Sequence, residues 1–424
     1  MTKTSKEEFE TYKIPDIGSQ EHSNSNIPFF LATAMKKDVS DNIKLKLEFD
    51  YEAEYKLKED LLSKYRNKIV SLEIHVKGTR DKFLLDSSIH FPALESLRII
   101  FEDLEENDEI DFDSEDSDGE KENEIERKKN STVNKAVFEA ILERHSNQLK
   151  SLGVGDFYFY NNETLAVPEL PMLDILFLSA CNSPVAKPII NSAKGTISQL
   201  YLSGVGISDP EEADLTMPNL TQLNIGGTNI DKLVQALLDK NSQHITSLIL
   251  DIVTQYSCIH WPKFPQLKEL STFADFLPLL SKCHKTLECL RIRSYYMDDP
   301  KPETYSPYLK MSKLKDLYFS GLESQIMNTI LKLNQDHLDL ISFHDIDIEE
   351  FIDIQGKMTS IQTVLLSRID QIQYYTGDIK RMFPRGTIHV EHRIKDIEII
   401  KEVAKTRKYN KLFKECIMES FDIY

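Results

Sequence analysis

The chain has 424 residues, of which 41% are hydrophobic, so it is long enough to bury a large core. Its formal net charge is −18, but fifteen acids and one base lie between residues 102 and 126 and leave a net charge of only −4 for the remainder. Direct nucleic-acid binding is disfavoured because it needs clustered Lys and Arg, and a basic protein partner fits this charge better.

The five cysteines, Cys181, Cys258, Cys283, Cys289 and Cys416, form no CxxC pair and are odd in number. This pattern argues against a disulfide framework or a zinc knuckle and indicates a reducing compartment. The start of the chain lacks an apolar signal core, and no apolar run approaches the roughly 18 residues that a bilayer span needs. We therefore expect a soluble protein without membrane contact, located in the cytoplasm, the nucleus or both.

In chain order, the polar residues 1–26 predict a flexible tail, because they offer little apolar surface to bury. Residues 27–68 predict an N-terminal cap with a first strand and helix, since residues 43–49 alternate between apolar and polar side chains. Residues 69–395 carry a repeated motif. Residues 396–424 carry two apolar stripes at helical spacing, which predict a C-terminal helical cap over the last repeat.

The repeated motif is Leu-x-x-Leu-x-Ile, as at Leu220, Leu223 and Ile225. Its first apolar position recurs every 47 residues, at Leu173, Leu220, Leu267, Leu314 and Ile361. A second set of motifs falls between these, and apolar residues three and four apart predict a helix before each one. The first apolar positions of the motifs in that second set are Ile69, Leu149, Ile197, Ile245, Leu287 and Leu338. A unit of about 24 residues with one strand and one return cannot bury its own apolar edge, so the units must stack.

This pattern resembles the strand motif L-x-x-L-x-L-x-x-N/C-x-L of the leucine-rich-repeat superfamily, over roughly residues 43 to 395. The resemblance implies an α/β solenoid of about 12–13 repeats, with a curved parallel sheet on the concave face and helices and irregular loops on the convex face. The irregular repeats are most similar to those of F-box substrate receptors, although residues 1–68 contain no recognisable F-box.

The chain departs from that family motif at the ninth position, where only Cys181 matches the Asn or Cys of the family. The other residues at this position are Phe157, Val205, Thr228, Val253, Tyr295, Leu322 and Ile346. Most of them are apolar, so we expect apolar packing in place of an amide ladder beneath the turn after each strand.

An acidic insertion interrupts the period between Leu94 and Leu173, which lie 79 residues apart instead of 47. The excess falls in residues 102–133, where like-charge repulsion predicts a disordered loop. Within it, Ser114 and Ser117 are candidate targets of an acid-directed kinase, because acidic residues follow them. The loop serves either as a contact for a basic partner or as an inert solvated insertion.

The fifth position of each strand points away from the core, because side chains alternate across a strand, and the seventh lies on the same side. These positions predict a partner-binding concave face rich in aromatic and arginine side chains, which are enriched at binding hot spots. Arg291, Arg293 and Tyr318 form the strongest local group, either to bind a carboxylate or as ordinary surface with one cation–π contact. The predicted contact residues are Phe177, Tyr201, Asn224, Asp251, Arg291, Arg293, Tyr318 and His344.

The sequence offers no recognisable pattern for catalysis. It contains no Gly-rich phosphate loop followed by Lys-Ser/Thr and no GxSxG motif. The cysteines and histidines between residues 258 and 289 have different offsets from the preceding strands, so stacking would not converge them on one metal. We therefore expect no enzymatic activity, no cofactor and no bound metal.

The leading hypothesis is a non-enzymatic scaffold that holds a protein partner on the concave face, with the acidic loop as an auxiliary contact. Similarity to F-box repeat proteins implies, as an alternative, the substrate-recognition subunit of a ubiquitin ligase. A regulator of a small GTPase is a further alternative, because acidic leucine-rich-repeat proteins that activate Ran exist and Arg80 offers a candidate exposed arginine. The last alternative is an acidic nuclear chaperone of basic proteins.

Overall fold

The computed structural model divides the chain into two compact units. Unit 1 contains residues 1–197 and 202–209, and unit 2 contains residues 198–201 and 210–424. The residues that the structure describes are 11–13, 43–48, 66–77, 90–102, 134–159, 164–208, 210, 214–227, 231–252, 259–294, 308–347, 350–351, 353–354, 356–369 and 372–390.

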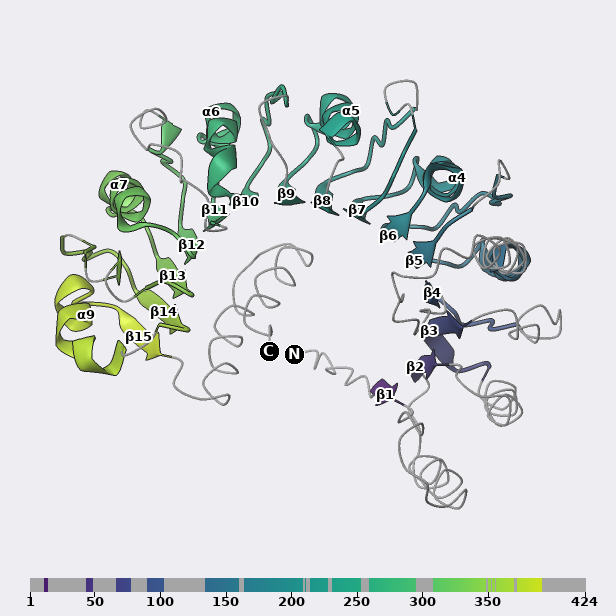
Figure 1. The fold of residues 1–424 in the computed structure, drawn as a ribbon, viewed down its shortest axis with the longest axis horizontal. Coiled ribbons are helices and arrows are strands. Elements are labelled where there is room, and N and C mark those ends of the chain that lie inside the picture. The colour runs from purple at the N-terminus through teal and green to yellow at the C-terminus, as the bar shows by residue number, and fades with distance from the viewer. Residues whose placement is uncertain are drawn as a thin grey trace, which may run out of the picture. The chain divides into compact units, whose positions relative to one another are not determined.

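In unit 1, strands β1 to β6 follow one another in chain order, and each pairs in parallel with the next. Their bounds are β1 (Thr11–Lys13), β2 (Ile43–Glu48), β3 (Ile69–Lys77), β4 (Ser96–Glu102), β5 (Ser151–Phe157) and β6 (Ile175–Cys181). Residues 134–145 are helical, and helix α4 spans Ser183–Ala193. Helix α4 buries Val185, Ile189 and Ala193, which lie one turn apart on one face, and that face packs on the sheet (Figure 1).

In unit 2, strands β8 to β15 also follow chain order with parallel pairing. Their bounds are β8 (Gln222–Gly227), β9 (Ser247–Ile252), β10 (Glu269–Phe273), β11 (Cys289–Arg293), β12 (Asp316–Ser320), β13 (Leu340–His344), β14 (Thr363–Ser367) and β15 (Thr387–Val390). Strand β7 (Gln199–Ser203) contains residues of both units.

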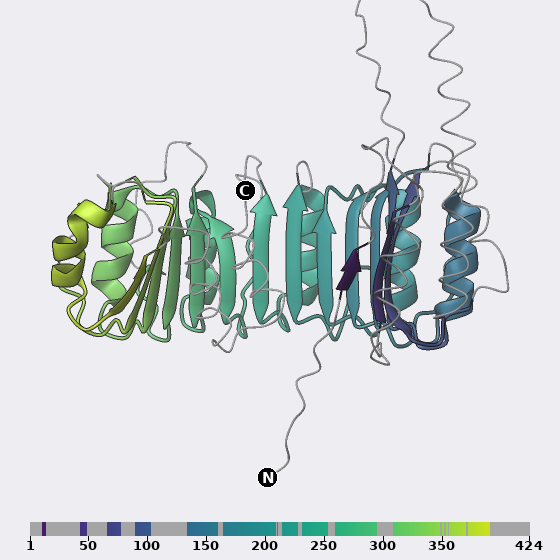
Figure 2. The same cartoon turned by 90° about the horizontal axis from the view of Figure 1, so that it is seen from below.

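The helical returns of unit 2 lie on one side of its strands, and the strands stand side by side (Figures 1 and 2). These returns are α5 (Asp231–Asn241), the 3₁₀ segment η3 (Ala274–Leu279), α6 (Leu280–Cys283), α7 (Ser324–Asn334), the 3₁₀ segment η6 (Ile372–Tyr375) and α9 (Thr376–Met382). Parallel strands with helical or irregular returns make an α/β solenoid-like fold, as the repeat predicts.

The core of each unit consists of the first, fourth and sixth positions of the motif. In unit 2, Leu220, Leu267, Leu314 and Ile361 are fully buried, and Leu173 is fully buried in unit 1. The prediction that residues 47 apart share the core is therefore confirmed within unit 2. Full burial of one such side chain stabilises the fold by about 1.5–3 kcal/mol, so the repeated aliphatic positions dominate the stability.

The eighth position of the motif has a left-handed backbone at strands β5 to β8 and β12 to β14. Its φ is +52° at Asp156, +60° at Gly204, +63° at Gly321 and +51° at Arg368, and Ala180, Gly227 and Asp345 share this conformation. The left-handed residue turns the chain out of the strand and brings the ninth side chain back over the core. The buried ninth-position residues are Phe157, Cys181, Val205, Leu322, Ile346 and Ile369. The predicted apolar packing is therefore confirmed at these positions, whereas Asp275, at the ninth position after β10, is exposed.

Two buried asparagines join the end of a helix to the segment that enters the preceding strand. Met217 N–H donates to Asn241 Oδ1 at 2.8 Å, and Asn241 Nδ2 donates to the carbonyl oxygens of Leu215 and Leu237. Asn334 makes the same three bonds to Met311, Leu309 and Ile330. Each side-chain amide therefore pairs with three buried backbone groups and holds the end of the helix against the segment before the preceding strand. These two asparagines were not predicted from the sequence.

Strand β1 lies within residues 1–26, where the sequence analysis expected a tail rather than a strand. The acidic insertion beyond Glu102, with Ser114 and Ser117, and the expected cap at residues 396–424 lie outside the described residues. Among the helices that the structure describes, none is long and apolar enough to cross a bilayer.

Candidate functional site

The face of the unit 2 sheet opposite its helices carries the side chains at the third, fifth and seventh positions of strands β8 to β14. We call it the inner face. Parallel pairing places equal positions next to each other, as with Ser271, Arg291 and Tyr318. The predicted fifth-position row is therefore in register throughout these strands. This row is Asn224, Ile249, Ser271, Arg291, Tyr318, Ser342 and Leu365.

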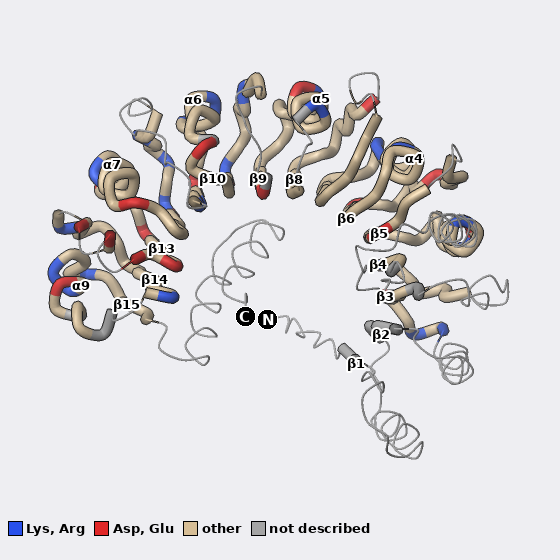
Figure 3. The backbone as a smooth tube through the Cα atoms, in the orientation of Figure 1, with Lys and Arg blue, Asp and Glu red and all other residues tan. Residues whose placement is uncertain are grey.

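The third position supplies a second row with a different character. Ser247, Glu269, Cys289 and Asp316 are neighbours in this row, so the two carboxylates flank Cys289 on adjacent strands. All four are buried. Both carboxylates take part in polar contacts, as a buried charge requires. Residues of both charges lie along the strands and helices of unit 2 (Figure 3).

The inner face is more buried than the sequence analysis expected. Asn224, Arg291, Tyr318 and His344 were predicted to face solvent, yet all four are buried. Among the predicted contact residues in unit 2, Asp251 keeps a substantially exposed side chain, at 48%. The sequence fixes the direction of these side chains through strand alternation, but it does not report what covers them.

Arg293 is the centre of a compact cluster at the seventh position. Its guanidinium carbon lies 4.4 Å from the ring centroid of Phe273, and its Nη1 lies 3.2 Å from Asp251 Oδ1. Its Nη2 also donates to the carbonyl oxygen of Leu250 at 3.4 Å. The predicted cation–π contact in this region therefore exists, but its aromatic partner is Phe273 on β10 and not Tyr318 on β12.

His344 is the seventh-position residue of β13 and pairs with Ser367 on β14. Its Nδ1 lies 3.0 Å from Ser367 Oγ in a buried hydrogen bond. Burial lowers the pKa of His344 to about 4, with smaller effects from the charges of Arg368 and Arg291. The imidazole is therefore neutral at physiological pH, and the positive charge of this area comes from the arginines.

Phe177 and Tyr201, the two remaining predicted contact residues, are half-buried. Phe177 lies on β6 in register with Gly153, and Tyr201 lies on β7. The structure therefore does not place all eight predicted residues in one cluster within a unit, because only those from Asn224 to His344 share the inner face of unit 2.

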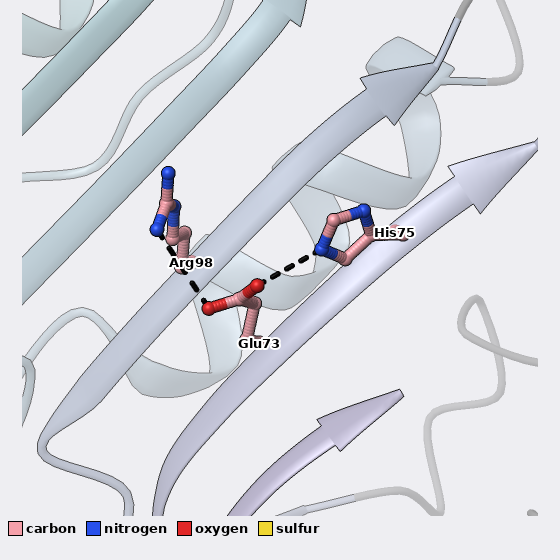
Figure 4. Close-up of polar contacts among 3 residues, drawn as sticks. All are labelled: Glu73, His75 and Arg98. Atoms are coloured by element: carbon pink, nitrogen blue, oxygen red, sulfur yellow. Dashed lines mark hydrogen bonds and ion pairs between the residues drawn. The ribbon is translucent and has the colours of Figure 1, made fainter. Parts of the chain in front are cut away.

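Unit 1 carries its own polar cluster on the corresponding face. Glu73 Oε1 lies 2.9 Å from His75 Nε2, and Glu73 Oε2 lies 3.8 Å from Arg98 Nη1 (Figure 4). Gly153 leaves room for the arginine stem, since a Cβ there would lie 2.9 Å from Arg98 Cγ. The arginine side chain is 60% exposed, so this ion pair contributes little to stability.

No group of three or more His, Cys, Asp or Glu in the described part of the chain is arranged to hold a metal. Burial raises the pKa of the Cys181 thiol to about 12 and raises that of Cys283 as well, so neither is a thiolate nucleophile at neutral pH. Arg80 and Cys258 lie outside the described residues.

No protein-family model matches the chain, and the search of curated proteins gave no match.

Proposed function

We propose that the chain is a leucine-rich-repeat interaction protein that binds a helical segment of a protein partner on the inner face of unit 2. The L-x-x-L-x-L strands, their parallel stacking and the left-handed residue at the end of strands β5 to β8 and β12 to β14 support the leucine-rich-repeat assignment. The observation that carries the binding role is the mixture of side chains in the registered rows of this face.

That mixture combines apolar side chains, set among polar ones in one row, with carboxylates in the neighbouring row. Ile249, Tyr318 and Leu365 belong to the fifth-position row, while Glu269 and Asp316 belong to the neighbouring third-position row. An amphipathic helix can bury its apolar side against these apolar residues. Basic residues beside the apolar side of that helix would complement the carboxylates. Tyrosine and arginine are also the residue types that carry most binding energy at protein interfaces.

A matched pair of charge reversals tests this function. Asp251→Lys changes the exposed acid of the inner face, and Asp336→Lys makes the same change at an exposed residue in the turn after α7. Quantitative affinity purification with the full chain should recover proteins that the Asp251 variant loses and the Asp336 variant retains. Purified candidates should then bind the wild-type chain directly. Identical protein sets for the wild type and both variants would overturn the proposal.

Tyr318→Ala provides an independent variant from the buried fifth-position row of the same face. It should weaken the same partners while circular dichroism shows an unchanged secondary structure. A loss of partners shared by Asp251→Lys and Tyr318→Ala, but not by Asp336→Lys, assigns the partner to the inner face.

A further inference from the structure

Gln222, Asn224 and Ser247 on the inner face of unit 2 bury side-chain oxygens that no other described residue pairs. Gln222 Oε1, Asn224 Oδ1 and Ser247 Oγ have no hydrogen-bond partner in the described part of the chain. The exposed fractions of these residues are 8%, 8% and 1%. Burial removes water from an oxygen, and folded proteins pair nearly all such atoms because an unpaired one destabilises the fold. Buried oxygens without a donor therefore indicate a ligand that supplies one.

Other buried amides of unit 2 are paired within the chain. Asn241 and Asn334 each accept a backbone N–H at the amide oxygen and donate to two carbonyl oxygens from the amide nitrogen. These bonds hold the returns in place. The amide oxygens of Gln222 and Asn224 make no such bond to a described residue, so the fold does not account for them.

The register of three strands brings these oxygens together with a carboxylate. Gln222 on β8 is the neighbour of Ser247 on β9, which in turn is the neighbour of Glu269 on β10. Neighbouring strands lie about 4.8 Å apart, so the long side chains of Gln222 and Glu269 can converge in front of the short Ser247. Asn224 lies two residues farther along β8 on the same side of the sheet, about 7 Å away. One small ligand group can thus reach all four side chains.

This part of the inner face is acidic. On β8 to β10, the third, fifth and seventh positions carry two carboxylates, Glu269 and Asp251, and no base. Asp251 is paired by Arg293 from β11 at 3.2 Å, whereas Glu269 lies in the row of Gln222 and Ser247. Oxygens that accept hydrogen bonds beside a negative charge match a cation that carries several N–H donors.

A lysine ammonium group fits this set of acceptors best. It is compact and carries three donors and one positive charge. An arginine guanidinium is a planar fork that matches the two oxygens of one carboxylate, and Ca²⁺ sites in proteins commonly use several carboxylates. The aliphatic stem of a lysine also packs on apolar surface, which Ile249 supplies next to Asn224.

We propose that a lysine side chain of the bound helix enters the inner face at β8 to β10, where its ammonium group donates to Gln222, Asn224 and Ser247. The carboxylate of Glu269 balances its charge. This inference rests on the proposed function, because it names the side chain by which the same face recognises its partner. Acetylation of that lysine removes its charge, so an acetylated partner should not bind.

Thermal unfolding of the full chain tests whether the amides are unpaired before a ligand binds. Asn224→Leu and Gln222→Met replace each amide with an apolar side chain of similar size. Removal of a buried polar group that has no partner is stabilising, so both variants should unfold at a higher temperature than the wild type. A lower unfolding temperature for both variants would show that the chain itself pairs these amides, and it would overturn the proposal.

Peptide binding tests the ligand. The probe is a fluorescein-labelled amphipathic helical peptide of leucine and lysine, and two counterparts carry arginine or Nε-acetyl-lysine in place of each lysine. Fluorescence anisotropy should show that the wild-type chain prefers the lysine peptide to both counterparts. In Asn224→Leu and Gln222→Met, the affinity for the lysine peptide should fall at least about tenfold, because each change removes a hydrogen bond to a charged group. The preference over arginine should disappear, although the formal charge of the protein is unchanged.

Thr363→Val is the matched control, because it removes a hydroxyl group from the third-position row at β14, away from β8. It should leave the affinity for the lysine peptide within about twofold, less than the loss of one hydrogen bond. Equal binding of the lysine and arginine peptides by the wild type, or unchanged affinity in both amide variants, would overturn the proposal. If calcium chloride raises the unfolding temperature of the wild type but not of Asn224→Leu, an inorganic cation occupies the site and the lysine is also ruled out.

The same variants separate this inference from the proposed function. If the lysine preference depends on Gln222 and Asn224 but affinity purification recovers identical proteins for the wild type and Asp251→Lys, the lysine site stands and the proposed partner fails. If partners depend on Asp251 and Tyr318 while the amide variants bind the lysine peptide as tightly as the wild type, the binding face stands and the lysine site fails.

Discussion

The guanidinium of Arg293 stacks on the ring of Phe273 at 4.4 Å, and parallel register accounts for this contact. Phe273 and Arg293 occupy the seventh position of adjacent strands, so their side chains leave the sheet side by side. Tyr318 occupies the fifth position and is the neighbour of Arg291 instead. The position of a residue within the motif thus decides which side chains it contacts on this face. Substitution of one residue can therefore measure the energy of one such contact.

Arg293→Ala should lower the free energy of unfolding of the protein by about 1–2 kcal/mol, because it removes a half-buried cation–π contact and an ion pair. Arg293→Lys should recover only part of this loss, since an ammonium group lacks the planar stacking surface. Asp251→Ala alone should cost less than about 1 kcal/mol, as its carboxylate is half exposed. Urea unfolding of the variants measures these differences, and a loss for Asp251→Ala greater than that for Arg293→Ala would contradict the assignment.

Asn334→Ala should destabilise unit 2 by about 2–3 kcal/mol. The change leaves Met311 N–H and the carbonyl oxygens of Leu309 and Ile330 buried without the amide that pairs them. Asn241→Ala should have a similar effect, because it makes the equivalent three bonds. Thermal unfolding of both variants checks this, with Asn328→Ala at a more exposed site on α7 as the comparison. A cost below about 0.5 kcal/mol for either buried asparagine would show that water replaces the amide.

Gly321→Ala should cost about 1–2 kcal/mol, because an alanine there must adopt a φ of +63° and its Cβ would lie 3.1 Å from the Ser294 carbonyl oxygen. Gly206→Ala is the control, since its φ is not left-handed and a Cβ there meets no atom within 4 Å. That substitution should be neutral within about 0.5 kcal/mol or slightly stabilising. Chemical denaturation compares the two, and equal effects would contradict the role of the left-handed turn.

Acid should destabilise the protein through His344. Its pKa is about 4 in the folded chain and 6.5 in an ordinary environment, so between these values the unfolded chain binds a proton that the folded chain does not. The free energy of unfolding therefore falls as the pH drops from about 6.5 to about 4, and the full shift corresponds to about 3 kcal/mol at most.

The variant His344→Gln should lose this share of the acid sensitivity, measured as unfolding free energy at a series of pH values. His145 has a pKa lowered to about 4 by burial, with further effects from His90 and Arg144, so His145→Gln should remove a second share. An unchanged pH profile for His344→Gln would mean that folding does not lower the pKa of His344.

Much of the architecture follows from sequence because it depends on local periodicity. Leu220, Leu267, Leu314 and Ile361 share one buried row, as their spacing predicts, and strand alternation places Arg291 and Tyr318 on the opposite face. The contacts between individual side chains on that face cannot be predicted from the repeat in the same way. Pairing Arg293 with Phe273 needs the register of two strands whose motifs begin 20 residues apart, at Leu267 and Leu287, and not the regular spacing of the repeat.

Burial of the inner face was not predictable from the motif, because the motif describes only which way a side chain points. The roles of Asn241 and Asn334 were not predictable for a different reason. Asparagine near the end of a helix ordinarily suggests a local cap, whereas here the amide reaches back to the segment that enters the preceding strand. Such a role depends on how closely two neighbouring repeats approach each other, and it leaves no signature in the local sequence.

The rim at which strand β4 ends determines where the chain can grow. Strand β4 ends at Glu102, the ninth position of its motif, and the next helical residues begin at 134, yet β4 and β5 stay aligned from Ser96 and Ser151 onward. Extra chain that leaves at this rim adds little closure entropy and does not shift the neighbouring strand. A reporter domain inserted between residues 102 and 134 should therefore leave the stacked strands undisturbed.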